Sequence, residues 1–349
     1  MVVRPEKHPA RIVQKMNEVM HSTDIAADAL IIGAGMTGLT AAVELQRAGL
    51  HVVVVDKGRG GGGRIASRRI GGAAFDHGAQ FMTGREPRFA GLLEEWRQAG
   101  LVMEWFRGFA GREDGHSRWR GNPAMTAVAK HLAQGIEVVL EKQVIALRSS
   151  GDGWSAETAT GKFLTSKAVL LTPPVPQSLA ILDAGGITIP PSMRERLEGI
   201  EYERCLAVMA VLDGPSRIPT PGGLALDDAA IAWLGDNQMK GISVEPAVTI
   251  HASHRFSLEH WEGDRLESGR GILAAAGKWL GARVKTFQVH GWRYSKPMQV
   301  AERSLEILHE SPMLVLAGDA FAAPRVEGAA VSGWAAAEAI LHSKIQTRS

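Results

Sequence analysis

The sequence has a single cysteine, Cys205, among its 349 residues. One cysteine excludes an intrachain disulfide and is typical of a protein of the reducing cytoplasm, where we expect this chain to act. No apolar run approaches the roughly 20 residues that cross a bilayer, so no membrane span is expected. The net charge is +2 and no long basic run occurs, which argues against nucleic-acid binding. No cluster of cysteine, histidine and acidic residues has metal-site spacing, so no metal is expected either.

What the chain does have is an ordinary globular composition, with 45% hydrophobic and 22% charged residues. A chain of this length can bury a large core, and we expect two domains. Residues 1–27 are polar, mixed in charge and without an apolar signal segment. We expect them to form a disordered extension, or to reflect a start codon placed too early.

A glycine-rich turn follows the first strongly apolar segment. Residues 30–32 run directly into a G-x-G-x-x-G motif, which predicts a buried parallel strand that ends in a tight turn. The first glycine permits the turn, the second lets a pyrophosphate approach the backbone, and the third lets the next helix pack closely. The residues expected to contact a dinucleotide here are Gly33, Gly35, Met36, Thr37 and Gly38.

A helix and a second strand complete this dinucleotide-binding pattern. Apolar side chains recur at helical spacing over residues 37–48, and residues 51–55 form the next apolar run. Asp56 follows that run, where an acidic side chain can accept hydrogen bonds from an adenosine ribose. The order of strand, helix, strand and acid favours a cofactor site over a glycine loop without a ligand.

A second glycine loop, GRGGGGR at residues 58–64, comes directly after the acid. A simple nicotinamide dehydrogenase needs no such loop, whereas FAD is longer and is held extended. Glycines let the loop lie against the cofactor, and Arg64 can neutralise phosphate charge. A flexible surface loop with a solvated arginine is the alternative. We expect Lys57, Gly63 and Arg64 to contact FAD.

A third motif lies near the C-terminus. Residues 313–320 form a buried-strand pattern that ends in Gly318-Asp319, and Glu327, Gly328 and Ala329 open a small-residue helix. An acid after a strand can bind cofactor hydroxyls. Helix N–H groups from Gly328 and Ala329 can face the flavin edge where negative charge develops on reduction. The alternative is an ordinary strand, loop and helix that close the sheet.

The motifs GAGMTG, DKGRGGGGR, FDHGAQF, LTPPVPQ and AGDAF…EGA together resemble the glutathione-reductase-type FAD superfamily, in its amine-oxidase branch. Segments in the middle of the chain are similar to the renalase-like family, and the resemblance runs from about residue 28 to 342. It implies FAD in an α/β, Rossmann-like FAD-binding domain. We expect the FAD to be non-covalent, because no cysteine lies near residues 327–329, and a histidyl link is the alternative. Further cofactor contacts are expected from Ala79, Gln80, Phe81 and Val144.

The pattern changes in the middle of the chain, where short strands alternate with turns rich in Gly, Pro and Asp. This predicts an α+β substrate domain with a mostly antiparallel sheet, suited to forming a cavity over the flavin. We assign residues 28–88, 136–175 and 296–345 to the discontinuous FAD-binding domain. Residues 89–135 and 176–295 are assigned to the substrate domain.

The substrate-site candidates rest on the resemblance. It implies catalytic roles for His251, in the strand VTIHAS, and for Asn237, which could form a hydrogen bond with a carboxamide. From the residues alone, His251 would be a core histidine and Asn237 a turn residue. The expected pocket residues are Trp233, Trp292, Arg293 and Tyr294. The alternative is that the aromatic residues only pack in the core and that Arg293 pairs with a surface carboxylate.

The resemblance implies an oxidase that takes a hydride from 2- or 6-dihydro isomers of NAD(P)H to flavin N5. Electrons then pass to O2, giving NAD(P)+ and H2O2, and the protein is a monomer or homodimer. A flavin amine oxidase acting on a small amine is the alternative. Because the chain has only two tyrosines, Tyr202 and Tyr294, the usual tyrosine-paired amine cage is not expected. A non-catalytic FAD- or NAD-binding protein also stays open.

Overall fold

The computed structural model describes residues 25–109 and 112–343. Residues 1–24 of the expected extension lie outside the described residues, whereas residues 25–27 already belong to the first strand.

The first layer is a mixed sheet in the order β16-β17-β10-β1-β2-β7, with β9 pairing with β10 and β8 pairing with β9. Its strands are β1 (Ile25–Ile32), β2 (Val52–Val55), β7 (Glu137–Val139), β8 (Val144–Ser150), β9 (Gly153–Thr158), β10 (Phe163–Leu171), β16 (Glu306–Glu310) and β17 (Met313–Leu316).

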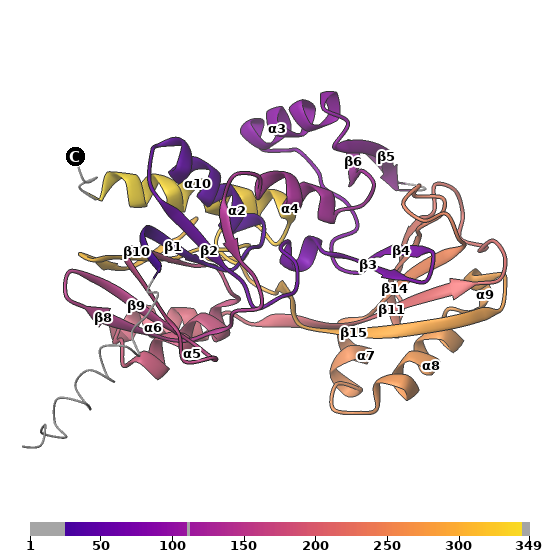
Figure 1. Cartoon of the computed structure of the whole chain (residues 1–349). Helices are drawn as coiled ribbons and strands as arrows, with labels where there is room; N and C mark the ends of the chain where they lie inside the picture. The colour runs from indigo at the N-terminus through magenta and orange to yellow at the C-terminus, as the bar shows by residue number, and fades with distance from the viewer. Residues whose placement is uncertain (1–24, 110–111, 344–349) are drawn as a thin grey trace, which may run out of the picture.

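The centre of this sheet is parallel, as the uninterrupted apolar runs predict. Helices cover both of its faces (Figure 1). One face carries α2 (Met36–Arg47), α3 (Pro87–Gln98), α4 (Thr126–Leu132) and α10 (Val326–His342), and the other carries α5 (Val175–Gly185) and α6 (Pro191–Glu198). The α/β, Rossmann-like prediction is therefore confirmed.

Residues 89–135, which we expected in the substrate domain, divide between the two parts of the molecule. Helices α3 and α4 bury Leu93, Trp96, Val128 and Leu132 in the core of the first sheet. The hairpin between them, β5 (Val102–Phe109) and β6 (Arg112–Gly121), contacts both of these helices and also β12 of the second sheet. The domain boundaries themselves stay a prediction.

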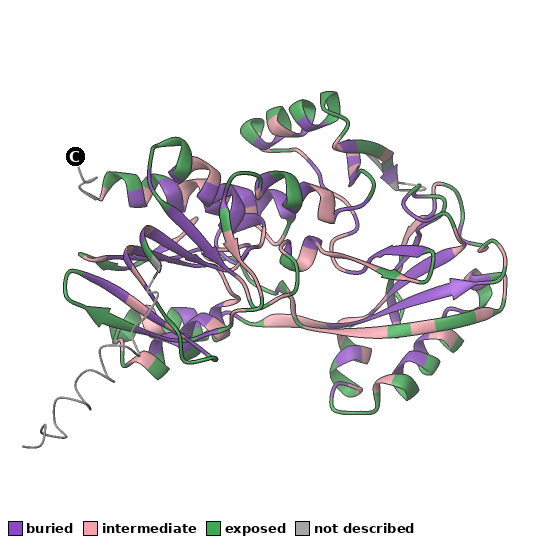
Figure 2. Cartoon of the chain, in the orientation of Figure 1, coloured by how far each residue is buried: buried purple, intermediate pink, exposed green. Residues whose placement is uncertain are grey.

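The second sheet is antiparallel throughout, in the order β12-β13-β14-β11-β15, as predicted. Its strands are β11 (Tyr202–Leu212), β12 (Gly223–Ala225), β13 (Ile231–Asp236), β14 (Ala247–Ala252) and β15 (Val284–Pro297). One face packs on α7 (His254–Glu259), α8 (Arg265–Ala275) and α9 (Gly277–Leu280). Figure 2 shows that burial is concentrated in the central strands of both sheets and on the inward sides of the helices, whereas β15 is largely intermediate or exposed.

The opposite face of the second sheet meets a hairpin that the sequence did not reveal. Strands β3 (Ser67–Ile70) and β4 (Ala73–Asp76) follow the short helix η1 (Gly63–Ile65). Phe75 packs with Met209 and Val211 of the sheet. The chain then leaves β4 directly into residues 77–81, which lie between the two sheets.

Candidate cofactor and substrate site

Glycine contacts close the turn between β1 and α2. Gly33 has a φ of +108°, and a Cβ there would lie 2.3 Å from the Thr172 hydroxyl oxygen. A Cβ on Gly38 would lie 2.0 Å from the Gly33 carbonyl oxygen, so only glycine lets the helix approach the strand this closely. At Gly35, by contrast, nothing lies within 4 Å of the Cβ position. The turn thus leaves space over Gly35.

The N-terminus of α2 is suited to an anionic group at that space. Gly35 is the N-cap residue, no side chain caps the helix, and the first turn holds no acidic residue. The first amides of a helix have no partner within it and carry partial positive charge. Met36 and Thr37, which follow, are buried. These features fit the pyrophosphate of FAD.

Asp56 connects the two glycine loops. Its Oδ2 accepts a hydrogen bond from the Ala34 amide at 2.8 Å, and its Oδ1 accepts one from the Gly58 amide at 2.6 Å. The Gly62 amide donates to the Ala34 carbonyl at 2.7 Å, which brings the second loop against the first. Each carboxylate oxygen keeps a second lone pair, so a ribose contact stays a prediction.

Arg64 joins the second glycine loop to the C-terminal motif. Its guanidinium donates to both carboxylate oxygens of Asp319, at 2.7 and 2.8 Å, and to the carbonyls of Tyr294 and Ser295, each at 3.4 Å. Burial alone would lower the pKa of Arg64, but the Asp319 carboxylate outweighs it and raises the pKa. The sequence assigned these two residues separate roles towards FAD, whereas the structure pairs them.

The start of α10 leaves three amides for a ligand. No side chain caps this helix. The Ala329 amide donates to the Arg325 carbonyl at 3.0 Å, so the amides without a helical partner are those of residues 326–328. Gly328 is held tightly, because a Cβ there would lie 2.2 Å from the Ala323 carbonyl oxygen. Of the two amides expected at the flavin edge, that of Gly328 is the one left to donate.

Glu327 contacts the protein backbone in this structure. Its Oε1 accepts hydrogen bonds from the amides of Arg85 and Glu86, each at 2.5 Å, and the residue is buried. The carboxylate therefore fixes the segment that leads into α3 to the start of α10. Its expected contact with FAD stays a prediction.

One face of the second sheet carries a row of rings, which we call the ring wall: Trp233, His251, His290 and Trp292. Trp233 pairs with His251, which pairs with Ala207, which pairs with His290, across four neighbouring strands. Directly opposed residues in a sheet share a face. Trp292 lies two residues further along β15, on the same face.

Residues 77–81 pass directly over this wall. The His77 carbonyl accepts hydrogen bonds from His251 Nε2 at 3.1 Å and from Trp292 Nε1 at 2.9 Å. The His77 ring stacks on Trp292 at 5.2 Å between centroids and meets His290 edge-on at 5.0 Å. Because a carbonyl can only accept, Nε2 of His251 carries the proton and Nδ1 does not.

The histidines at the wall are uncharged near neutral pH. Burial lowers the pKa of His77 to about 3, and the neighbouring His290 and Arg68 lower it further. Burial also lowers the pKa of His251 and of His290 to about 4 each. At pH 7 none of the three is a proton donor in its cationic form.

The other predicted residues of segment 77–81 either hold the segment in place through hydrogen bonds or add an aromatic ring to it. The Ala79 amide donates to the Arg64 carbonyl at 2.8 Å. The Gln80 side-chain amide donates to the Asp76 carbonyl at 2.6 Å. The Phe81 ring lies 5.8 Å from that of Trp233, between centroids. Ala79 and Gln80 therefore hold the segment in place, and Phe81 adds a ring beside the wall.

An ion pair that the sequence did not reveal supports the same segment. The Lys240 ammonium lies 2.6 Å from Asp76 Oδ2, and neither side chain has exposed surface. Asp76 Oδ1 accepts from the Ser67 hydroxyl and the Met125 amide. Burial lowers the pKa of Lys240, while the Asp76 carboxylate acts in the opposite direction. The acid just before His77 was the available signal, because a buried carboxylate needs a partner.

The structure places Asn237 in the turn that follows β13. Its side-chain amide donates to the Thr249 hydroxyl at 3.0 Å and its exposed fraction is 0%. Its backbone amide donates to the Ala247 carbonyl. These contacts hold the connection between β13 and β14, and a bond from Asn237 to substrate stays a prediction.

Four further predicted residues lie apart from the ring wall. Arg293 alternates with Trp292 along β15, and its guanidinium lies over the Trp261 ring. Tyr294 packs edge-on against Tyr202 at 5.4 Å between ring centroids. The remaining two are Val144, which is buried at the start of β8 in the first sheet, and Lys57, whose ammonium donates to a glutamine on α5.

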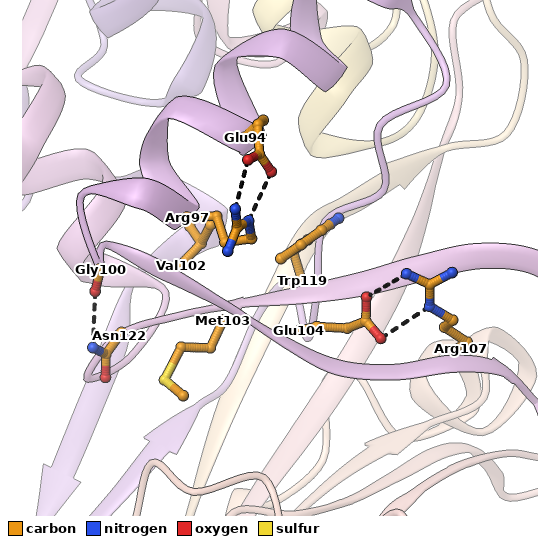
Figure 3. Close-up of a pocket in the computed structure, with 9 residues that line it drawn as sticks. All are labelled: Glu94, Arg97, Gly100, Val102, Met103, Glu104, Arg107, Trp119 and Asn122. Atoms are coloured by element: carbon orange, nitrogen blue, oxygen red, sulfur yellow. Dashed lines mark hydrogen bonds and ion pairs between the residues drawn. The ribbon is translucent and has the colours of Figure 1, made fainter.

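A hollow of about 620 Å³ lies elsewhere, between α3 and the β5–β6 hairpin (Figure 3). Its charged side chains neutralise one another, since Glu94 pairs with Arg97 and Glu104 pairs with Arg107. None of the predicted site residues lines it. We therefore assign it no part in the site.

No helix within residues 25–109 and 112–343 is long and apolar enough to cross a membrane. In the same part of the chain, no three histidine, cysteine or acidic side chains are grouped closely enough to hold a metal ion.

Two protein-family models match the chain. An NAD(P)-binding Rossmann-like domain matches residues 31–96, and a flavin-containing amine oxidoreductase matches residues 89–341. Among curated proteins, renalase of Mus musculus is 26% identical over 84% of this chain and 92% of its own length. Lysine-specific histone demethylase 1 homolog 2 of Oryza sativa subsp. japonica is 38% identical over 23% of this chain and 10% of its own length.

Solved structures share the fold. A putrescine oxidase variant superposes with a TM-score of 0.70 at 16% identity, covering 92% of this chain and all of that one. A putative protoporphyrinogen oxidase from Exiguobacterium sp. 255-15 gives 0.69 at 14% identity, covering 91% of this chain and 99% of that one. At these identities the likeness supports the fold alone.

Proposed function

Since the chain belongs to the family of flavin-containing amine oxidoreductases, we propose that it is an FAD-dependent oxidase of dihydronicotinamides. Its donors are the 2- or 6-dihydro isomers of NAD(P)H. When bound, FAD would accept the hydride and pass the electrons to O2, giving NAD(P)+ and H2O2. The enzyme class follows from the family, whereas the donor is a proposal that the ring wall and the likeness to renalase support.

The residues at the glycine loops fit the cofactor. The space over Gly35 and the uncapped start of α2 would take the pyrophosphate, and Asp56 lies where a ribose would follow. The free amides at the start of α10 would face the flavin edge that becomes negative on reduction. The Arg64–Asp319 pair holds these two regions together.

The ring wall is the observation that carries the donor assignment. Its rings are aromatic, partly buried and uncharged, so they suit an uncharged, planar dihydropyridine that must lie flat. Such a ring is already a hydride donor and needs no general base. In a site that oxidises an amine we would expect a free lysine near the flavin, but the ammonium of Lys240 is buried and forms an ion pair with Asp76.

Anaerobic mixing tests the proposal directly. Purified holoenzyme would be mixed with 2-dihydro-NAD, 6-dihydro-NAD, ordinary NADH and putrescine, while the flavin absorbance is followed. We expect the 2- or 6-dihydro isomers to bleach the flavin much faster than NADH or the amine. Rapid bleaching by putrescine, with slow bleaching by both isomers, would instead identify an amine oxidase.

A further inference from the structure

A second hollow, of about 340 Å³, lies between the β3–β4 hairpin and the start of α4. Three cationic residues, Arg68, Arg69 and Lys130, are among those that line it, and no acidic residue is. Arg69 shares a face of the hairpin with Ala74, whereas Arg68 shares the other face with Phe75. Within the described residues none of the three cationic residues has an ion-pair partner. We call this feature the basic hollow.

The charge of the basic hollow is unlike that of the larger one. There, each lining arginine is paired with a glutamate. Here the lining includes three cationic residues and no carboxylate, which raises the local positive potential. Such a site favours an anion, and arginine forks match the oxygens of a phosphate group.

The basic hollow lies close to the ring wall. Ala74 lines it and is three residues from His77, which is roughly 10 Å along an extended strand. Arg68 is near enough for its charge to act on both His77 and His290. The remaining lining is apolar in part, with Pro123 and Ile242 among its residues. A ligand with a ring at the wall and phosphates further out could therefore span both places.

We propose that the basic hollow binds the phosphate groups of the hydride donor, an anionic dinucleotide whose dihydropyridine ring lies at the ring wall. The inference rests on the proposed function and names the part of the molecule that selects a dinucleotide. A small amine is a cation, so the positive charge of the basic hollow would not stabilise its binding. The basic hollow thus selects a phosphate-bearing donor over a small cation.

Two variants test the assignment with a pair of donors. In Arg69→Gln and in Lys130→Gln, we expect the KM for 6-dihydro-NAD to rise about tenfold, because each change removes a charge-assisted contact to phosphate. The KM for 6-dihydronicotinamide riboside, which has no phosphate, should change less than twofold. Arg69→Lys should recover part of the loss. Lys162→Gln removes an exposed cation from the β9–β10 turn, which does not line the basic hollow, and is the matched control.

Binding of pyrophosphate to the holoenzyme separates this inference from the proposed function. Calorimetry should show pyrophosphate binding to the unaltered protein and to Lys162→Gln, and much weaker binding to Arg69→Gln. Absence of binding to the unaltered protein, or equal KM changes for both donors, would overturn the assignment. If the holoenzyme binds pyrophosphate but no dihydropyridine reduces its flavin, the proposed function is overturned. The basic hollow would then remain a site for an anion.

Discussion

Gly35 and Gly38 lie in the same turn, yet a methyl group would act differently at the two positions. At Gly38 it would meet the Gly33 carbonyl oxygen at 2.0 Å, whereas at Gly35 it would meet no protein atom within 4 Å. We therefore expect Gly38→Ala to lower the free energy of unfolding of the apoprotein by about 1–3 kcal/mol. Gly35→Ala should leave that free energy within about 0.5 kcal/mol and weaken FAD binding at least about tenfold.

Urea unfolding of the apoprotein and fluorescence titration with FAD separate the two effects. Gly91→Ala, on the exposed side of α3 with nothing within 4 Å of its Cβ position, is the control. It should raise the free energy of unfolding by about 0.5–1 kcal/mol and leave FAD binding unchanged, because alanine forms helix better than glycine. Normal FAD affinity in Gly35→Ala would show that the space over Gly35 is not the pyrophosphate site.

At the scale of the element, the ring wall makes the second sheet sensitive to acid. The pKa of His251 is lowered by burial from 6.5 to about 4. Between these values the unfolded chain binds the proton and the folded chain does not, so stability is present above pH 6.5 and falls as the pH drops towards 4. For this one side chain we expect a loss of about 2 kcal/mol between pH 7 and pH 5.

Replacement of the titrating ring tests this expectation. His251→Gln keeps a donor near the His77 carbonyl but cannot be protonated in this range. The difference in the free energy of unfolding between pH 7 and pH 5, from urea melts, should therefore be smaller in the variant by about 2 kcal/mol. Equal differences in the two proteins would mean that His251 is accessible to protons in the folded state.

Elements with a strong local pattern could be predicted from the sequence. The apolar runs of β1, β2, β14 and β17 are short and bounded by glycine or polar residues, and all four are strands. Asn122-Pro123 has the pattern of an N-cap followed by a first helical position, but α4 starts at Thr126. Strands β3 and β5 carry charged side chains among apolar ones, so their pairing depends on the partner strand and not on a local apolar run.

At the scale of the whole molecule, the motifs could be predicted but their pairings could not. Each glycine loop has a local signature, whereas the partners Asp76 and Lys240 are 164 residues apart and Arg64 and Asp319 are 255 apart. No periodicity or spacing links such residues. They meet because the chain crosses repeatedly between the two sheets, and β15 runs the length of the second sheet towards the first (Figure 1).

The Arg64–Asp319 pair should couple the N-terminal loops to the C-terminal motif. Its side chains are 29% and 11% exposed, so loss of one partner leaves the other poorly solvated. We expect Asp319→Asn and Arg64→Gln each to lower the free energy of unfolding by about 2 kcal/mol, with the double variant no worse than the more damaging single one. Arg270→Gln, which breaks an exposed pair with Glu267, should cost less than about 1 kcal/mol. Urea unfolding of the four variants measures the coupling, and strictly additive effects at the first pair would mean that the two regions are held together by other contacts.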